Sequence, residues 1–166
     1  MKYMAKLSLI RIDFRLIHGQ VVAKWLKTIQ ATKIIVVNNT LAKDPVMSNI
    51  YKMATPADVK CSVVGIDTFI AAWNKNQLGE GNALVLFKDV HTTLEVWKKG
   101  FPIEQLQIGG LGAGPGRKAV YLNMTLNPED AAMLTEMSSG GVNVFFQATP
   151  EDKPMEYEKI MESVSF

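Results

Sequence analysis

The chain has 166 residues, of which 48% are hydrophobic and 20% are charged. This length fits one ordinary domain with a sizeable core, so we expect a single domain over residues 1–166 that folds without disulfides or metal. Its 18 basic and 16 acidic residues give a formal charge of +2 and are interspersed along the chain, which argues against a dedicated nucleic-acid-binding protein.

Cysteine and histidine are too few for the common metal sites. Cys61 is the one cysteine, and His18 and His91 are far apart in the sequence. We therefore expect no intrachain disulfide, no zinc site and no cofactor. No apolar run reaches the ~20 residues that a membrane-spanning helix needs, and the first residues lack the pattern of a cleavable signal peptide. These features predict a cytoplasmic protein.

Short β-branched runs alternate with amphipathic segments, a pattern typical of a mainly parallel sheet with helices on both faces. Nearly continuous apolar runs predict strands at 7–13, 33–37, 60–64, 83–87, 105–108 and 142–148. Helical spacing predicts helices over 19–29, 44–53, 67–75, 89–100 and 127–137, the last four capped by Asp44, Asp67, Asp89 and Asn127. Residues 119–126 are compatible with a short strand or hairpin arm. The fold class is α/β, an open, mainly parallel twisted sheet of about six or seven strands.

A glycine-rich segment, GGLGAGPGRK at residues 109–118, interrupts this alternation. It does not fit the dinucleotide-binding pattern G-x-G-x-x-G, because Pro115 or Arg117 stands where the third glycine would be. Two interpretations stay open for this segment. Its backbone amides and Arg117 could approach a phosphoryl group or a partner, or the segment could be an inert loop.

Ligands of open α/β sheets bind beyond the carboxyl ends of the strands. By that rule one functional edge gathers residues 13–19, 38–43, 65–67, 87–89 and 109–118. Lys88 ends a predicted strand at this edge and is a candidate anion ligand. His91 lies in the first turn of a predicted helix, where we expect a solvated or capping role rather than catalysis.

The segment RIDFRLIHGQVV, residues 11–22, concentrates charge between a predicted strand and a predicted helix. If the helix begins near Gly19, His18 lies at its N-terminus, where free N–H groups and the helix dipole attract an anion. Arg15 can then contact phosphoryl oxygens, while Asp13 can bind an arginine or fix a ring N–H of His18. A neutral imidazole is already a nucleophile at neutral pH. The segment therefore suits phosphoryl transfer.

Other interpretations of the same residues stay open at this point. His18 can simply bridge the strand and the helix, with Arg11 and Arg15 in surface ion pairs. The protein would then be a non-catalytic regulatory or ligand-binding module. A hydrolase with Asp13 as base and His18 as acid is disfavoured, because no second nucleophile or metal set accompanies them.

The sequence RIDFRLIHGQVVAKWL resembles the motif R-I-D-x-R-L-I-H-G-Q-V of the IIB subunits in the mannose/fructose/sorbose family of the phosphoenolpyruvate-dependent sugar phosphotransferase system. The resemblance continues through ATKIIVVNNTLAKDPV, KMATPADVKCSVV, ALVLFKDVHTTLEVWKKGFPIEQLQIGG and GVNVFFQATPEDKP, almost the whole chain. It implies a protein-Npi-phosphohistidine–sugar phosphotransferase whose His18 accepts a phosphoryl group from a phospho-IIA partner, on Nδ1. The group then passes to a sugar carried by the membrane subunits IIC and IID, with which the protein would associate peripherally. Arg11, Asp13 and Arg15 match the charged residues of the motif, Arg15 being the better candidate for phosphate contact.

Three features depart from the family pattern. Many relatives carry acidic residues where this chain has Phe14, Asn38 and Asn39, and the 109–118 loop is richer in glycine than is usual in the mannose members. These departures leave open which partner and which sugar the protein serves: mannose, fructose, sorbose, N-acetylgalactosamine or glycan fragments. The sequence also leaves open whether the protein is a homo-oligomer.

Overall fold

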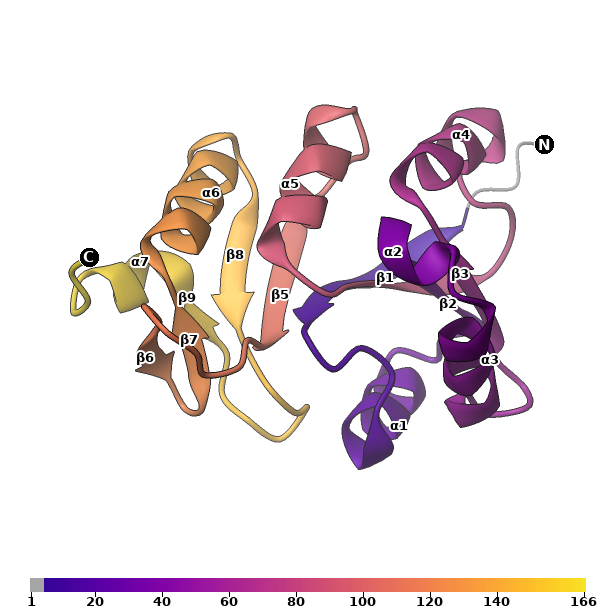
Figure 1. Ribbon diagram of the computed structural model, residues 1–166, viewed down its shortest axis with the longest axis horizontal. Helices are drawn as coiled ribbons and strands as arrows, with labels where there is room; N and C mark the ends of the chain where they lie inside the picture. The colour runs from indigo at the N-terminus through magenta and orange to yellow at the C-terminus, as the bar shows by residue number, and fades with distance from the viewer. Residues whose placement is uncertain (1–4) are drawn as a thin grey trace.

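The computed structural model describes residues 5–166, apart from the side chains of residues 20 and 21, as an α/β fold around a seven-stranded sheet (Figure 1). The sheet contains β1 (Lys6–Asp13), β2 (Lys33–Val37), β3 (Lys60–Val64), β4 (Asn82–Phe87), β5 (Gln105–Gly110), β8 (Asn143–Phe146) and β9 (Met155–Glu156). Their spatial order is β3-β2-β4-β1-β5-β8-β9, and neighbouring strands run parallel except β8 and β9. A separate antiparallel hairpin joins β6 (Lys118–Tyr121) and β7 (Met124–Leu126).

The helices lie on both faces of this sheet, as Figure 1 shows. They are α1 (Gly19–Thr28), α2 (Asn39–Ala42), α3 (Pro45–Ala54), α4 (Ile66–Asn76), α5 (Val90–Lys98), α6 (Pro128–Ser139) and α7 (Tyr157–Met161). Alternate residues of a strand face opposite sides, so Ile34 packs in the core beneath α1 and α3, while its neighbour Ile35 packs in the core beneath α4, α5 and α6. The predicted fold class is therefore confirmed.

The structure corrects one predicted cap. Asp44, Asp89 and Asn127 accept backbone N–H groups at the starts of α3, α5 and α6, as expected. The prediction of Asp67 as a cap is wrong, because α4 begins at Ile66 and Asp67 lies inside its first turn. The Oδ1 atom of Asn39 accepts the N–H of Ile66 at 2.8 Å, so a residue from another part of the chain satisfies this helix end.

Three short elements were not predicted: α2, β9 and α7. Each is too short to show a hydrophobic period. Helix α2 begins where Asn38 accepts the N–H of Leu41 at 2.9 Å. In the part of the chain that the structure describes, β9 pairs with β8 through two residue pairs. The strand expected at 142–148 is accordingly shorter, at Asn143–Phe146.

Strand β1 lies in the middle of the sheet and sets the position of the functional edge. It pairs with β4 from Lys6 onward, whereas its pairing with β5 begins at Arg11. β1 and β5 therefore meet at their carboxyl ends and diverge at their amino ends. Within residues 5–166, no helix is both long enough and apolar enough to cross a membrane.

Candidate active site

A tight turn connects the carboxyl end of β1 to α1. Asp13 pairs with Gly110 of β5, and α1 begins at Gly19 with His18 as its N-cap. Within the turn, Leu16 has a φ of 57° and is fully buried. This left-handed conformation costs a non-glycine residue about 1–2 kcal/mol, and the packing of Leu16 beneath α1 offsets that cost. The turn is thus held in shape by the core below it.

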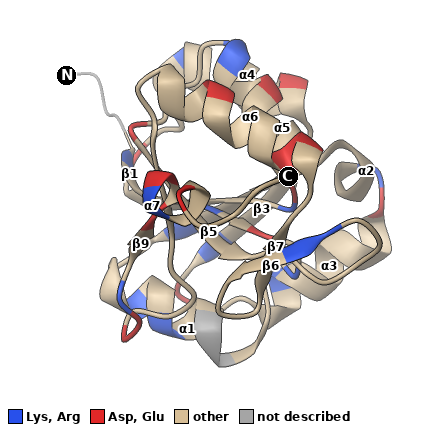
Figure 2. Cartoon of the chain, turned by 90° about the vertical axis from the view of Figure 1, so that its left-hand side faces the viewer, with Lys and Arg blue, Asp and Glu red and all other residues tan. Residues whose placement is uncertain are grey.

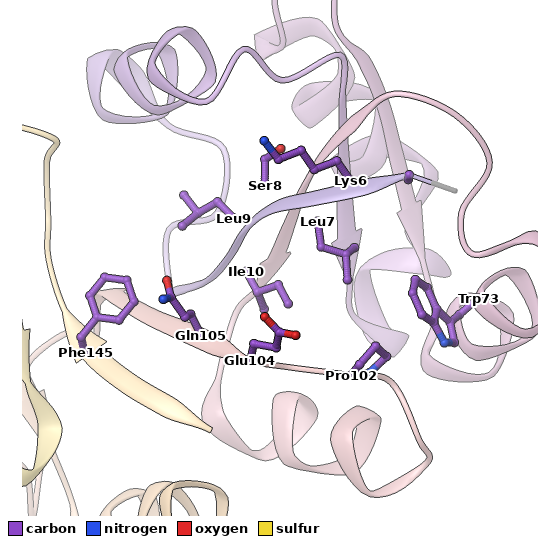
Figure 3. A pocket seen from close by; sticks show the side chains of 11 residues that line it. Lys6, Leu7, Ser8, Leu9, Ile10, Trp73, Pro102, Glu104, Gln105 and Phe145 are labelled. Atoms are coloured by element: carbon purple, nitrogen blue, oxygen red, sulfur yellow. The ribbon is translucent and has the colours of Figure 1, made fainter. Parts of the chain in front are cut away.

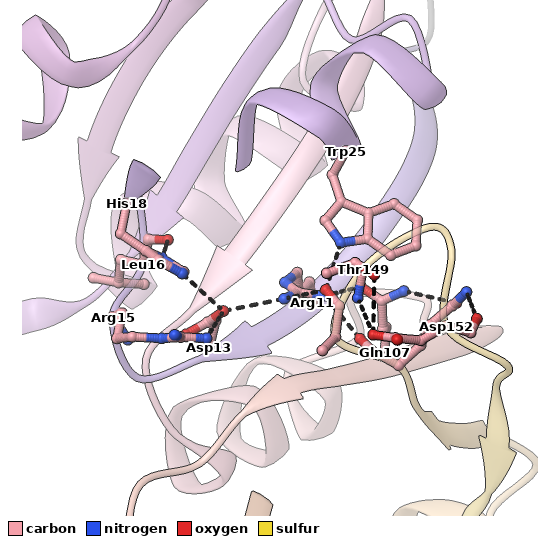
Figure 4. Close-up of polar contacts among 11 residues, drawn as sticks. Arg11, Asp13, Arg15, Leu16, His18, Trp25, Gln107, Thr149 and Asp152 are labelled. Atoms are coloured by element: carbon pink, nitrogen blue, oxygen red, sulfur yellow. Dashed lines mark hydrogen bonds and ion pairs between the residues drawn. The ribbon is translucent and has the colours of Figure 1, made fainter. Parts of the chain in front are cut away.

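Asp13 is fully buried and binds both arginines of the motif (Figure 4). Its Oδ2 accepts Nη2 of Arg11 at 3.1 Å, while its Oδ1 accepts the backbone N–H of Arg15 at 3.0 Å and Nε of Arg15 at 3.2 Å. Nε2 of His18 lies 4.0 Å from the same carboxylate. Burying a carboxylate is costly unless it is paired and hydrogen-bonded in this way. Asp13 is the acceptor around which the other charged groups are arranged.

Arg11 is 1% exposed, so the interpretation that places it in a surface ion pair is wrong. Besides Asp13, its guanidinium donates to Oε1 of Gln107 and, at 3.0 Å each, to the backbone carbonyls of Gln147 and Ala148. It also lies 5.6 Å from the ring centroid of Trp25. Burial lowers the pKa of Arg11, and the neighbouring Asp13 opposes that change. Arg11 therefore holds Asp13 from inside the protein and is out of reach of a substrate.

The segment after β8, residues 147–152, completes this support and was missed from the sequence. Gln147 accepts Nε2 of Gln107 at 3.2 Å and donates to the carbonyl of Asp152 at 2.9 Å. Trp25 of α1 donates its ring N–H to the carbonyl of Ala148 at 2.9 Å. One signal was present: Gln107 is a polar residue within a buried parallel strand, where it needs a hydrogen-bonding partner.

His18 is partly exposed, at 24% of its side chain. Its Nδ1 lies 3.0 Å from the carbonyl of Leu16, and since a carbonyl only accepts, Nδ1 holds the proton in this arrangement. Nε2 is buried and has no hydrogen-bond partner among the described residues. The His18 side chain does not cap α1, and the first turn of α1 contains no acidic residue. An anion on His18 would therefore meet the positive end of α1.

The remaining candidates lie in different surroundings. Arg15 is 43% exposed, stays bound to Asp13 and places its guanidinium 5.4 Å from the ring centroid of Phe14. Lys88 is exposed at the end of β4, beside β1, and makes no salt bridge among the described residues. Arg117 binds Asp130 at 2.7 Å and Thr125 at 2.8 Å. Its contacts tie the glycine-rich segment to the start of α6 rather than to the motif.

The first glycines of the 109–118 segment allow the arginines and Asp13 to approach. A Cβ atom on Gly109 would lie 1.9 Å from Cζ of Arg11, and one on Gly110 would lie 2.8 Å from Oδ1 of Asp13. Side chains at these positions would displace the charged groups of the site. Part of the unusual glycine content is thus a requirement of packing against Arg11 and Asp13.

A cavity of about 490 Å³ lies at the opposite end of the sheet, where β1 and β5 diverge (Figure 3). Its lining includes Leu7, Leu9, Trp73 and Phe145, and it contains no residue of the charged motif.

Basic and acidic residues are interspersed over the helices and strands (Figure 2). Among residues 5–166, no group of three or more His, Cys, Asp or Glu side chains is arranged to hold a metal ion.

Comparison with known proteins relates this geometry to a family. Residues 7–166 match the family described as PTS system sorbose subfamily IIB component. The sorbose-specific EIIB component of Klebsiella pneumoniae is 31% identical over 147 residues, which cover 89% of this chain and 90% of that protein. The mannose-specific EIIAB component of Escherichia coli is 25% identical over 96% of this chain and 48% of its own length.

A solved structure agrees with the sequence matches. The crystal structure of manxB from Thermoanaerobacter tengcongensis superposes with a TM-score of 0.90 at 34% identity, covering 97% of this chain and 98% of the other. The structural match therefore covers nearly the whole chain, and the family match over residues 7–166 includes the turn that carries His18. The chain belongs to the sorbose subfamily of IIB components of the sugar phosphotransferase system.

Proposed function

We propose that the protein is a phosphocarrier that accepts a phosphoryl group on His18 from a phospho-IIA protein and passes it to a sugar during uptake through the IIC and IID membrane subunits. The name of the matched EIIAB component joins an A and a B component, which supports a IIA donor. The protein would act in the cytoplasm, peripherally associated with the membrane complex. Membership of the IIB family makes phosphoryl transfer the reaction to test.

The observation that carries this proposal is the setting of His18. A partly exposed imidazole stands at the uncapped N-terminus of α1, with buried Asp13 on one side and half-exposed Arg15 nearby. The helix N-terminus and the arginine favour an incoming phosphoryl group, and Asp13 can balance the positive charge that the ring gains on phosphorylation. Phosphoryl transfer needs this kind of positioning and electrostatic support rather than further covalent chemistry.

The burial of Nε2 supports Nδ1 as the attacking atom of the His18 ring. Nε2 is buried and turned toward Asp13, so a partner cannot reach it. Attack by Nδ1 needs a lone pair that faces the donor. The proton on Nδ1 must therefore move to Nε2, where Asp13 can accept a hydrogen bond, and the ring must turn so that Nδ1 leaves the carbonyl of Leu16. The bond from phosphorus to the donor histidine breaks as the bond to Nδ1 forms. The donor ring keeps the bonding electrons, and Asp13 balances the positive charge on the phosphorylated ring.

Arg11, Asp13 and Arg15 then have separate roles in the proposal. Arg15 is exposed and can contact the phosphoryl oxygens, whereas Arg11 is enclosed and orients Asp13. Lys88 stands at the same edge and can add positive charge for the phosphoryl group. Arg117 supports the glycine-rich segment through Asp130.

The test is phosphorylation in the reconstituted system. The protein is incubated with phosphoenolpyruvate, the general phosphotransferase proteins and the cognate IIA protein, and its label is measured. We expect one phosphate that is acid-labile and base-stable, as a phosphohistidine is. His18→Ala should abolish the label, and His91→Ala, at the exposed second histidine, should keep it. Equal labelling of the His18→Ala protein would overturn the proposal. Release of a hydrolysis product by the protein alone, without any partner protein, would favour a hydrolase instead.

A further inference from the structure

We propose that Phe14 is the apolar anchor by which the phosphodonor protein docks beside His18, with Arg15 held over its ring to meet the anionic phosphoryl group of the donor. This inference rests on the proposed function and names the surface that carries out its first step. Phe14 immediately follows Asp13 and lies in the turn that ends at His18. Any protein that brings a phosphohistidine to His18 must cover this turn.

Phe14 combines exposure with a fixed position. Its side chain is 42% exposed, although it is a large aromatic residue in a charged turn. The backbone N–H of Phe14 donates to the carbonyl of Gly110 at 3.1 Å. Its ring lies so close to Gly112 that a Cβ atom there would be 3.1 Å from ring carbons. Rigid, exposed aromatic side chains lose little conformational entropy on binding and often dominate the binding energy of an interface.

Arg15 shares the same platform. Its guanidinium contacts the Phe14 ring on one side and the Asp13 carboxylate through Nε on the other. Almost half of its side chain remains exposed. The pair therefore presents an apolar face next to a cation, which fits a partner surface that carries an apolar recess beside an anion.

Two other residues of this edge of the sheet, Asn38 and Asn39, are used inside the fold. Asn38 caps α2 through Leu41, and Asn39 caps α4 through Ile66. Their side-chain oxygens are acceptors, as the oxygens of an acidic residue would be. The Phe14 ring instead lies against Gly112 and Arg15 and is 42% exposed. Its identity is best explained by what binds over it.

The charges favour the donor protein over the sugar-bearing complex as the occupant. In the first transfer, the partner brings the phosphoryl group and is therefore anionic at the contact. In the second transfer, the phosphoryl group is already on His18, and the acceptor is a neutral hydroxyl. A cation placed on the rim of the docking surface steers an anionic partner and adds to complex formation. Arg15 on Phe14 serves the first encounter.

The experiment measures initial rates of phosphoryl transfer from labelled phospho-IIA as its concentration is varied. For Phe14→Ala we expect the KM for phospho-IIA to rise about tenfold, in the range of an interface anchor. The maximal rate should stay within twofold, because Asp13 still holds Arg15 through its backbone N–H and Nε. Phe14→Tyr should restore the KM because it keeps the ring. Met53→Ala is the matched control, since Met53 is an exposed apolar side chain on α3, at 84%, away from the turn.

A partner-free reaction separates docking from the reactivity of His18. Phosphoramidate is a small phosphoryl donor, and it should label the parent protein and Phe14→Ala at the same rate. If phospho-IIA labels His18 but Phe14→Ala leaves the KM unchanged, the docking role is wrong and the proposed function stands. A lower maximal rate with an unchanged KM would also overturn the docking role. If phospho-IIA does not label His18 in the parent protein, the proposed function itself fails.

Discussion

The two ends of β1 differ in what they enclose. At the carboxyl end, Arg11 and Asp13 are almost completely buried and are joined by hydrogen bonds to Gln107 and the 147–152 segment. At the amino end, a cavity of about 490 Å³ is lined mainly by apolar side chains. The proposed chemistry lies at the packed end. Enzymes that act on small molecules usually bind them in a pocket. A site with a tightly packed base and an exposed histidine is better suited to transfer between two proteins.

One strand pairing produces both ends. β1 and β5 pair from Arg11 onward and separate toward their amino ends. The charged residues sit where the strands meet, so their backbones are fixed on both sides. The cavity occupies the place where the strands part. Substitutions at the two ends should therefore have different effects on stability and on transfer.

Arg11→Met should have the largest effect. It leaves the buried carboxylate of Asp13 with one fewer partner, and removing one member of a buried ion pair costs about 3–5 kcal/mol. We expect the free energy of unfolding, measured in urea, to fall by about that amount. Lys24→Met is the control, because Lys24 forms an exposed ion pair with Glu151, and such pairs contribute less than about 1 kcal/mol. Equal losses in both variants would mean that burial of Arg11 is unimportant.

Gly109→Ala should be the next most disruptive change. The added Cβ atom would lie 1.9 Å from Cζ of Arg11, and overpacking of this kind costs about 1–3 kcal/mol. Phosphoryl transfer from phospho-IIA should slow as well, because a displaced Arg11 would also displace Asp13, to which it is hydrogen-bonded. Gly114→Ala in the same segment serves as the comparison, because its nearest atom would be Cδ of Arg117 at 3.4 Å. A harmless Gly109→Ala would show that Arg11 can move without consequence.

Arg15→Lys should affect transfer rather than stability. Lysine cannot keep the planar fork that contacts Asp13 and lies on Phe14. We expect single-turnover transfer to slow about tenfold, equivalent to about 1.4 kcal/mol. The free energy of unfolding should stay within about 0.5 kcal/mol, as for other exposed substitutions. An unchanged transfer rate would make Arg15 a peripheral residue.

Ser8→Ala should have the smallest effect and the opposite sign. The Oγ atom of Ser8 is buried beside the amino-end cavity and has no hydrogen-bond partner within residues 5–166. Removing an unsatisfied buried hydroxyl should stabilise the fold by about 1 kcal/mol, with no change in transfer. If the free energy of unfolding falls instead, the Ser8 hydroxyl has a hydrogen-bond partner in solution. The amino end of β1 would then differ less from its hydrogen-bonded carboxyl end.

The parts of this site that follow from neighbouring residues could be predicted. The apolar run before Asp13 and the helical spacing after Gly19 locate His18 at a strand-to-helix junction, and the structure places it there. The caps at Asp44, Asp89 and Asn127 follow from the same local rules. These features depend on residues only a few positions apart.

The features that depend on distant residues could not be predicted. The burial of Arg11 requires its hydrogen bonds to Gln107 and Gln147. The residues next to Arg11 in the sequence do not indicate which distant residues these partners are. The start of α4 depends on Asn39, which is 27 positions earlier. The cavity results from the way β1 leaves β5, which is set by the register of the sheet. A polar residue inside an apolar strand indicates a buried contact without identifying the partner.

The contacts of Arg11 also link activity to the completion of folding. Arg11 donates to carbonyls that lie 136 and 137 positions later in the chain. During synthesis, the histidine motif emerges early, but its supporting acceptors do not exist until residues 147 and 148 have been made. Contacts between such distant residues form late because closing a long loop is entropically costly. An unfinished chain would therefore carry the histidine without its ordered carboxylate, and only the complete fold would be ready to receive a phosphoryl group.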